Sequence, residues 1–202
     1  MNFLAHCHLS GENRDILFGN FIADSVKGSE FNKFPTDIKN GIIHHRKIDT
    51  YTDRHEIVRS SIKLIRPVYG KFSGIIIDIY YDHFLALNWK MFHNQELSNY
   101  SRDVYLTLGK RFKYLPARNR RMLPFLIAQN WLSSYANIDD LRRVFWGMDR
   151  RTKNISGMKD AVEQLVMNHK LLETHFMDFY PELQEYAKET LNTIITNENE
   201  KL

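Results

Sequence analysis

The chain has 202 residues, of which 43% are hydrophobic and 13% aromatic, a composition that excludes an intrinsically disordered protein and allows a substantial core. The formal net charge of +4, with an isoelectric point near 9.1, is too mild for a polyanion-binding tail and does not indicate a nucleic-acid partner. The lone cysteine excludes an internal disulfide, and no apolar run of about 18 residues could cross a membrane. Residues 1–9 contain histidines and lack the charged start of a secretory signal, so we expect a cytoplasmic protein.

The first predicted helix runs from Asp15 to Lys27. It carries Leu17, Phe21 and Asp24 on one face, spaced by four and three residues, and Gly28 ends it. A carboxylate on such an inward-facing stripe needs a hydrogen-bond donor, a basic partner or a metal ion.

Three further helices follow. Thr36 is the predicted N-cap of a helix that runs toward Asp53, and the next helix covers His55 to Val68, with Pro67 marking a break. Gly74 to Phe92 is apolar almost throughout, which predicts a buried central helix. Its run of three isoleucines could equally open a strand, but no alternating, turn-bounded segments elsewhere support a sheet.

The second half of the chain also favours helices. The predicted segments are Leu97 to Lys110, Met122 to Ala136, Ile138 to Met148 and Ser156 to Tyr180. Pro181 lies in or before a last helix, and the polar tail after Ile195 should fray. No repeat, linker or change of composition marks a domain boundary. We therefore predict a single compact all-α domain over residues 1–202, with about seven to nine helices.

Acidic and histidine side chains recur at helical spacing in the first half of the chain. His45, Asp49 and Asp53 are four residues apart in turn, so they share a helix face with about 5–6 Å between neighbouring Cβ atoms. That spacing suits a ligand pair on a metal with a further carboxylate to orient the imidazole. Pairing of Asp49 with Arg46 or of Asp53 with a neighbouring cation is the ordinary alternative.

A second stripe lies in the predicted central helix. Asp78 and Asp82 share a face, and His83 is about a quarter turn from Asp82. Two carboxylates on a buried helix need partners, either a metal or the arginines of the basic segments.

The ligand types narrow the chemistry. Carboxylate with imidazole and without thiolate suits Mn²⁺, Mg²⁺, Fe²⁺ or Zn²⁺. The sequence contains no Walker loop, dinucleotide glycine motif or nucleophile elbow. Hydrolysis of a phosphate-type ester by metal-activated water is therefore the economical mechanism.

Basic residues gather in two segments, 110–121 and 142–153. Such runs are ordinary solvated surface in many proteins, and the alternative is a docking face for an acidic macromolecule. Both interpretations stay open from the residues alone.

Several segments together closely resemble the acyl carrier protein phosphodiesterases. The opening residues MNFLAHCHL and the segment Gly19 to Asp24 (GNFIAD) carry the resemblance first. The others are Gly41 to Asp49 with Thr52-Asp53, Asp78 to Leu85 with Trp89, Trp131 to Tyr135, Gly147-Met148 with Arg150-Arg151, Leu172-Glu173, Phe176 and Phe179 to Pro181. The resemblance spans nearly the whole chain.

The resemblance implies a phosphodiesterase that removes 4′-phosphopantetheine from the serine of holo acyl carrier protein, an acidic protein substrate. It implies an HD-domain-like, all-helical metal phosphohydrolase that prefers Mn²⁺. From charge and hydropathy we expect no nucleic-acid or membrane partner. The implied metal ligands are Asp24, His45, Asp49, Asp78 and Asp82. The implied catalytic residues are Asp24, Asp82, His83 and His6. The candidate substrate-binding residues are Arg46, Arg118, Arg121, Arg142 and Arg150.

The remaining residues of these motifs receive no role. His44 adjoins a matched histidine, and Cys7 occupies a position at which the family is expected to be aliphatic, which argues against a nucleophile. Two other functions stay open: a phosphohydrolase of the same fold acting on a nucleotide or another small phosphodiester, and a non-catalytic helical binding protein.

Overall fold

The computed structural model describes residues 1–199, and these residues form helices joined by short connections without any β-strand. The α-helices are α1 Phe3–His8, α2 Arg14–Ile22, α3 Thr36–Arg54, α4 Glu56–Tyr69, α5 Ser73–Leu87, α6 Trp89–Phe92, α7 Leu97–Lys110, α8 Ala117–Ala128, α9 Trp131–Ser134, α10 Ile138–Arg151, α11 Ala161–Met167 and α12 His169–Asn199. Short 3₁₀ turns occupy Ala23–Ser25, Glu30–Lys33, Gly70–Phe72, Phe112–Tyr114 and Met158–Asp160. The predicted all-α class is confirmed.

Several predicted boundaries differ from the observed ones. The helix expected over Gly74 to Phe92 is two helices, α5 and α6, and the helix expected over Met122 to Ala136 is divided into α8 and α9. Asn130 lies between α8 and α9 with a φ of 43°, a left-handed conformation that asparagine tolerates better than most residues. Pro67 does not break α4, which continues to Tyr69.

The ends of other helices also shift. The first predicted helix ends at Ile22, so Asp24 lies in a 3₁₀ turn rather than on an α-helical face. Pro35 occupies the N-cap position of α3 in place of Thr36, which is the first helical residue. Helix α12 includes Pro181 and continues through residues 195–199, part of the tail expected to fray; residues 200–202 lie outside the described part.

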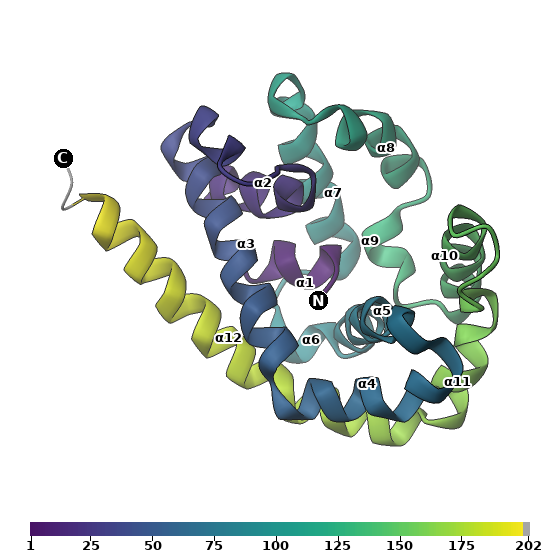
Figure 1. Ribbon diagram of the computed structural model, residues 1–202. Coiled ribbons are helices and arrows are strands. Elements are labelled where there is room, and N and C mark those ends of the chain that lie inside the picture. The colour runs from purple at the N-terminus through teal and green to yellow at the C-terminus, as the bar shows by residue number, and fades with distance from the viewer. Residues whose placement is uncertain (200–202) are drawn as a thin grey trace.

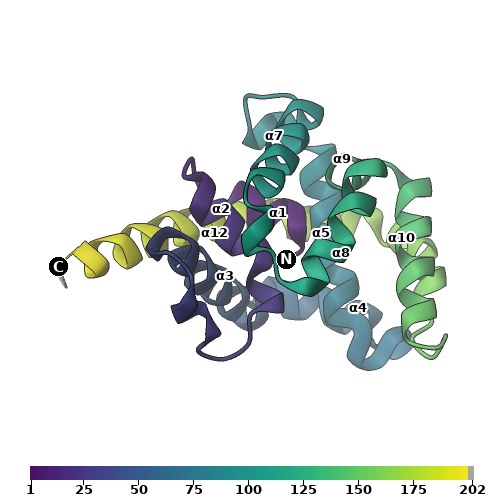
Figure 2. The same cartoon turned by 90° about the horizontal axis from the view of Figure 1, so that it is seen from above.

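Helix α5 runs through the core, and α1, α4, α6 and α12 pack against it. Its side chains from Ile76 to Ala86 are nearly all buried, and Tyr81 and Phe84 contact the buried rings of Phe176 and Phe179 from α12. Figures 1 and 2 show α12 lying along α3 and extending beyond it toward the C-terminus. Within residues 1–199, no helix combines the length and apolarity needed to cross a bilayer.

Helices α2 and α3 cross at close range. A Cβ atom built on Gly19 would lie 2.0 Å from the carbonyl oxygen of Ile38, and one built on Gly41 would lie 2.1 Å from that of Ile16. Both distances are far below van der Waals contact, so only glycine fits at these two positions. The backbones of α2 and α3 therefore touch, which fixes the register between Asn20 on α2 and the histidines on α3.

We expect Gly41→Ala to lower the free energy of unfolding by about 2 kcal/mol or more, because the added methyl meets backbone atoms that cannot rotate away. Urea unfolding followed by circular dichroism measures the change. The matched control is Gly109→Ala in α7, where an added Cβ meets nothing within 4 Å. That variant should keep its stability or gain up to about 1 kcal/mol from helix propensity. Equal losses in the two variants would contradict the close crossing.

Candidate metal-dependent active site

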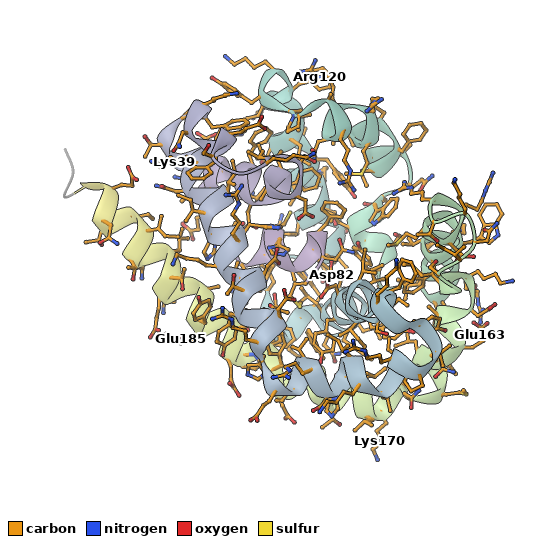
Figure 3. The ribbon with its side chains drawn as sticks, viewed as in Figure 1. Lys39, Asp82, Arg120, Glu163, Lys170 and Glu185 are labelled. Atoms are coloured by element: carbon orange, nitrogen blue, oxygen red, sulfur yellow. The ribbon has the colours of Figure 1, made fainter. Side chains whose placement is uncertain are left out.

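Helix α1 brings His6 into the site, and Asp82 of α5 holds the helix in place. The Asp82 carboxylate accepts backbone N–H bonds from Leu4 at 2.8 Å, Ala5 at 3.2 Å and Asn2 at 3.3 Å. An isolated helix of six residues is unstable in water, so this buried anchor sets its position. Burial raises the pKa of Asp82 to about 7, against the three N–H donors, which favour the carboxylate. Figure 3 places Asp82 at the centre of the molecule beside α1.

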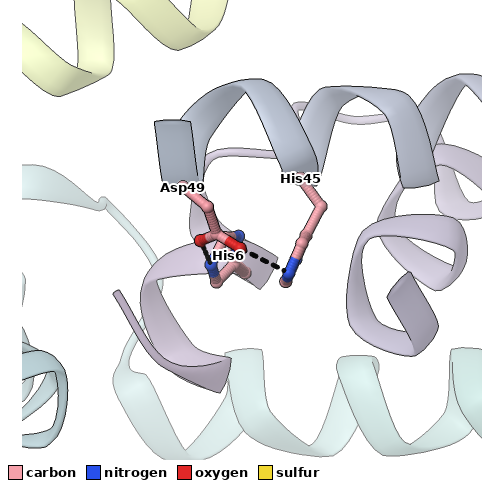
Figure 4. A group of neighbouring side chains, drawn as sticks. All are labelled: His6, His45 and Asp49. Atoms are coloured by element: carbon pink, nitrogen blue, oxygen red, sulfur yellow. Dashed lines mark ion pairs between the residues drawn. The ribbon is translucent and has the colours of Figure 1, made fainter. Parts of the chain in front are cut away.

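Three side chains from α1 and α3 converge beside this anchor (Figure 4). His6 Nε2 lies 3.0 Å from Asp49 Oδ1, and His45 Nε2 lies 3.0 Å from Asp49 Oδ2. The two imidazole rings stack with their centroids 3.8 Å apart. Asp24 reaches the group from the 3₁₀ turn after α2, with its Oδ1 3.3 Å from His45 Nε2. Because Asp49 and Asp24 remain partly exposed, the group opens to solvent on their side.

A buried asparagine sets the orientation of both rings. Asn20 Oδ1 accepts hydrogen bonds of 3.0 Å from the Nδ1 atoms of His6 and His45. Its amide nitrogen lies 3.4 Å from His44 Nδ1, and His44 Nε2 donates to the Ala187 carbonyl at 2.9 Å. The carbonyl can only accept, so His44 carries its proton on Nε2 and presents Nδ1 as an acceptor. The Asn20 amide nitrogen therefore donates to His44, which leaves Asn20 Oδ1 facing the other two histidines. His6 and His45 then carry their protons on Nδ1.

The consequence is that the Nε2 atoms of His6 and His45, in their neutral forms, direct lone pairs at carboxylate oxygens. In the part of the chain that the structure describes, His6 Nε2 is buried without a hydrogen bond of acceptable geometry, although Asp49 Oδ1 is 3.0 Å away. An imidazole nitrogen and a carboxylate oxygen that both present lone pairs repel each other, so either a proton or a cation must lie between them. One ligand atom from each of His6, His45 and Asp49 lies within 4.8 Å of the others. Ligand atoms about 3 Å apart suit neighbouring positions around a cation with bonds of about 2.1 Å.

The pKa values of the two histidines shift in opposite directions. Burial and the neighbouring His45 lower the pKa of His6 to about 4. Burial also disfavours the charged form of His45, but its hydrogen bonds to Asp24 and Asp49 outweigh that and raise its pKa to about 9. Burial alone would raise the pKa of Asp49, but the adjacent imidazoles of His45 and His6 hold it far below its usual range, and the hydrogen bond to His45 lowers the pKa of Asp24. Both carboxylates are therefore ionised at neutral pH, as ligands of a cation must be.

Sequence comparison with known proteins identifies the family. A sequence model of the family described as "Acyl carrier protein phosphodiesterase" matches residues 1–183, a span that includes every residue of this group. The chain belongs to the acyl carrier protein phosphodiesterase family. The resemblance read from the sequence motifs is thereby confirmed.

Curated relatives that carry the name acyl carrier protein phosphodiesterase match over almost their full length. The protein of Enterobacter sp. (strain 638) is 32% identical over 189 residues, which cover 93% of this chain and 98% of the relative. That of Photorhabdus laumondii is 32% identical over 189 residues, covering 93% and 96%. That of Escherichia coli O45:K1 is 34% identical over 191 residues, covering 93% and 97%. No solved structure matches the chain.

The structure brings together some of the site residues predicted for this phosphodiesterase family member and gives others different partners. His6, Asp24, His45 and Asp49 meet in one group. Asp78 Oδ1 accepts from the Met1 amine at 2.8 Å, and Asp82 holds α1. Among the described residues, neither carboxylate is in the group that could share one cation with His6. Their predicted roles as metal ligands stay predictions.

Two more predicted residues have contacts that the sequence did not reveal. His83 Nδ1 donates to the Tyr135 carbonyl at 2.7 Å, directed toward α9, and its catalytic role stays a prediction. Arg46 donates to the Val26 and Gly28 carbonyls, so it holds the segment after Asp24 in place.

The other predicted arginines lie on α8 and α10. Arg142 pairs with Glu163, and Arg150 lies over the Trp146 ring at 4.7 Å. Arg118 and Arg121 line a groove between the two helices. Their predicted roles in substrate binding are not decided by these contacts.

Asn20 and His44 contact this group, and the sequence prediction gave neither residue a role. Asn20 lies one turn before Asp24 in the Gly19 to Asp24 motif, so its position could have been noticed. Its double acceptor role depends on the crossing of α2 and α3, which no local pattern shows.

We expect Asp82→Ala to lower the free energy of unfolding by about 3 kcal/mol or more, because it leaves buried N–H groups of α1 without acceptors. The matched control is Asp178→Ala, an exposed position within α12, which should change stability by less than about 0.5 kcal/mol. Urea unfolding measures both. An Asp82→Ala variant as stable as the control would rule out the anchoring role.

In protein treated with a chelator, we expect His45 to stay protonated up to about pH 9 and His6 to stay neutral down to about pH 4. A raised pKa means that the stabilising contribution of His45 is complete below pH 6.5, its unfolded value, and is lost as the pH rises to about 9. The stability that neutral His6 contributes depends on pH in the opposite direction. It is complete above pH 6.5 and is lost as the pH falls to about 4.

Nitrogen-15 NMR of the histidine rings measures both titrations. His45→Gln assigns the high-pH titration by removing it. Asp49→Asn should lower the pKa of His45, because it removes a negative charge 3.0 Å from Nε2. Two histidines that titrate together near their ordinary pKa would contradict the burial of His6 and the pairing of His45 with Asp24 and Asp49.

Proposed function

We propose that this chain hydrolyses the phosphodiester that joins 4′-phosphopantetheine to a serine of holo acyl carrier protein. The products are apo carrier protein, with its serine hydroxyl free, and 4′-phosphopantetheine. The observation that supports this most strongly is the convergence of His6, His45 and Asp49 within the span that matches the acyl carrier protein phosphodiesterase family. The relatives' name supplies the substrate, and the group supplies a means of hydrolysis.

The proposal includes a divalent cation held by His6 Nε2, His45 Nε2 and Asp49, with Asp24 at the open side. Two imidazoles and carboxylates without thiolate suit Mn²⁺, Fe²⁺ or Zn²⁺, and Mg²⁺ to a lesser degree. We favour Mn²⁺ on the resemblance to the family. When bound, such a cation lowers the pKa of a water molecule and offsets negative charge on the phosphoryl oxygens.

The protein's own residues do the positioning. Asn20 and His44 hold the two imidazoles in the tautomer that leaves Nε2 free, and Asp82 keeps His6 in place through α1. Asp24 is 66% exposed and ionised, so it can accept the proton of the attacking water. In the reaction, the water oxygen bonds to phosphorus as Asp24 accepts its proton, and the bond from phosphorus to the serine oxygen breaks. The serine oxygen takes a proton from solvent, and Asp24 returns its proton to solvent.

Mass spectrometry of holo acyl carrier protein incubated with the enzyme and Mn²⁺ tests the proposal. We expect loss of one phosphopantetheine group, abolished by chelator and restored by added Mn²⁺. Loss of a residue that hydrogen-bonds a metal ligand typically lowers activity by ~10–100-fold, and we expect Asn20→Leu to lower kcat/KM within that range. Asp49→Asn removes a proposed ligand itself, so it should lower kcat/KM by more. Metal content per chain, measured in parallel, should fall in both variants.

Asp53→Asn is the matched control, since Asp53 is an exposed carboxylate one turn beyond Asp49 on the same helix. It should retain both metal and activity. If the mass of the carrier protein does not change although the enzyme binds metal, the substrate is instead a nucleotide or another small phosphodiester. No reaction and no stoichiometric metal would favour the non-catalytic binding protein.

A further inference from the structure

Helices α8, α9 and α10 enclose a surface groove of about 1120 Å³ that the hydrolytic chemistry does not use. Along α8, the lining side chains Arg118, Arg121 and Phe125 are three and four residues apart, so they form one face. Along α10, the lining side chains Arg143 and Arg151 are two turns apart on the facing helix. The groove thus lies between two helix faces of the same character.

The charge of the groove is strongly one-sided. Its lining includes four arginines and a single acidic residue, Asp140, which is already paired with Arg143. In the part of the chain that the structure describes, Arg118, Arg121 and Arg151 have no carboxylate within ion-pair distance. Unpaired arginines on facing helices repel one another, so a negatively charged partner would bind favourably by offsetting that repulsion.

Aromatic side chains lie between these charges. Phe125 is 65% exposed and Trp146 is 55% exposed, an unusual amount for large apolar rings. Trp131 lines the groove from α9. Exposed aromatics with arginines around them are the composition of protein–protein contact sites, in which tryptophan and arginine contribute most of the binding energy.

We propose that this α8–α10 groove binds an acidic amphipathic helix of the carrier-protein substrate, a partner that rests on the proposed function. An acidic helix meets both features, since its carboxylates face the arginines while its apolar face covers Phe125 and Trp146. The volume exceeds the range of about 300–1,000 Å³ typical of small-molecule pockets. A free phosphopantetheine arm would also leave most of the four arginines without partners.

The groove lies on a different side of the molecule from the candidate site. Figures 1 and 2 agree that α3 lies on one side of α1, whereas α8 and α10 lie on the other side. The groove is also connected to the site through the core. Trp131 donates to the Tyr135 hydroxyl, the Tyr135 carbonyl accepts from His83, and the preceding residue, Asp82, holds α1.

Binding of apo acyl carrier protein tests the docking surface separately from hydrolysis, because the apo protein has no phosphodiester. Calorimetry with a bacterial acyl carrier protein should give a dissociation constant raised about tenfold or more in the Arg118→Glu/Arg121→Glu variant. Trp146→Ala should weaken binding by a similar factor, and Trp146→Phe by less. The matched control is Arg59→Glu/Lys63→Glu, which makes the same change of charge on the exposed face of α4. It should change the constant less than twofold.

With holo carrier protein as substrate, the Arg118→Glu/Arg121→Glu variant should raise KM about tenfold and leave kcat nearly unchanged. Circular dichroism checks that each variant folds, and Arg118→Gln/Arg121→Gln replaces the reversal if it does not. Equal effects of the α8 and α4 variants on binding would overturn the docking site. Binding that depends on the groove without any hydrolysis by the native chain would instead reject the proposed function and leave the docking site standing.

Discussion

Helices α2 and α3 cross with their backbones in contact, because neither Gly19 nor Gly41 carries a Cβ atom. The contact sets the distance and register at which Asn20 meets the histidines of α3. A side chain at either glycine would separate the helices by more than a hydrogen bond can stretch. The orientation of His6 and His45, and hence the position of their Nε2 lone pairs, depends on this one crossing.

The buried polar residues of this site form a network in which each contact is a hydrogen bond, except where His6 Nε2 faces Asp49. The Ala187 carbonyl determines the tautomer of His44, which orients Asn20, which in turn orients His6 and His45. Buried polar groups are nearly always paired, so His6 Nε2, the atom of this network that has no hydrogen-bond partner among the described residues, marks a functional position. The hydrophobic core around α5 holds this network rigid.

Recognition and chemistry occupy different parts of the molecule in our proposals. The α1–α3 side holds a compact group of ionised carboxylates and oriented imidazoles, whereas the α8–α10 side presents arginines and exposed rings. This division has a physical basis. Arginines next to Asp24 and Asp49 would compete with a cation for the same oxygens, while arginines across the molecule can attract an acidic protein without doing so.

The sequence by itself determined the all-α class, most of the helices, the family and the candidate side chains. Helical periodicity is local, and the motif residues are readable one by one. It could not separate His45 and Asp49 from Asp78 and Asp82, because both pairs have the same four-residue spacing. Only the tertiary structure decided that Asp49 meets His6, that Asp82 serves as the anchor of α1, and that Asn20 and His44 orient the rings. Those outcomes depend on contacts between residues up to 143 positions apart, which hydrophobic packing and the α2–α3 crossing create and no local pattern encodes.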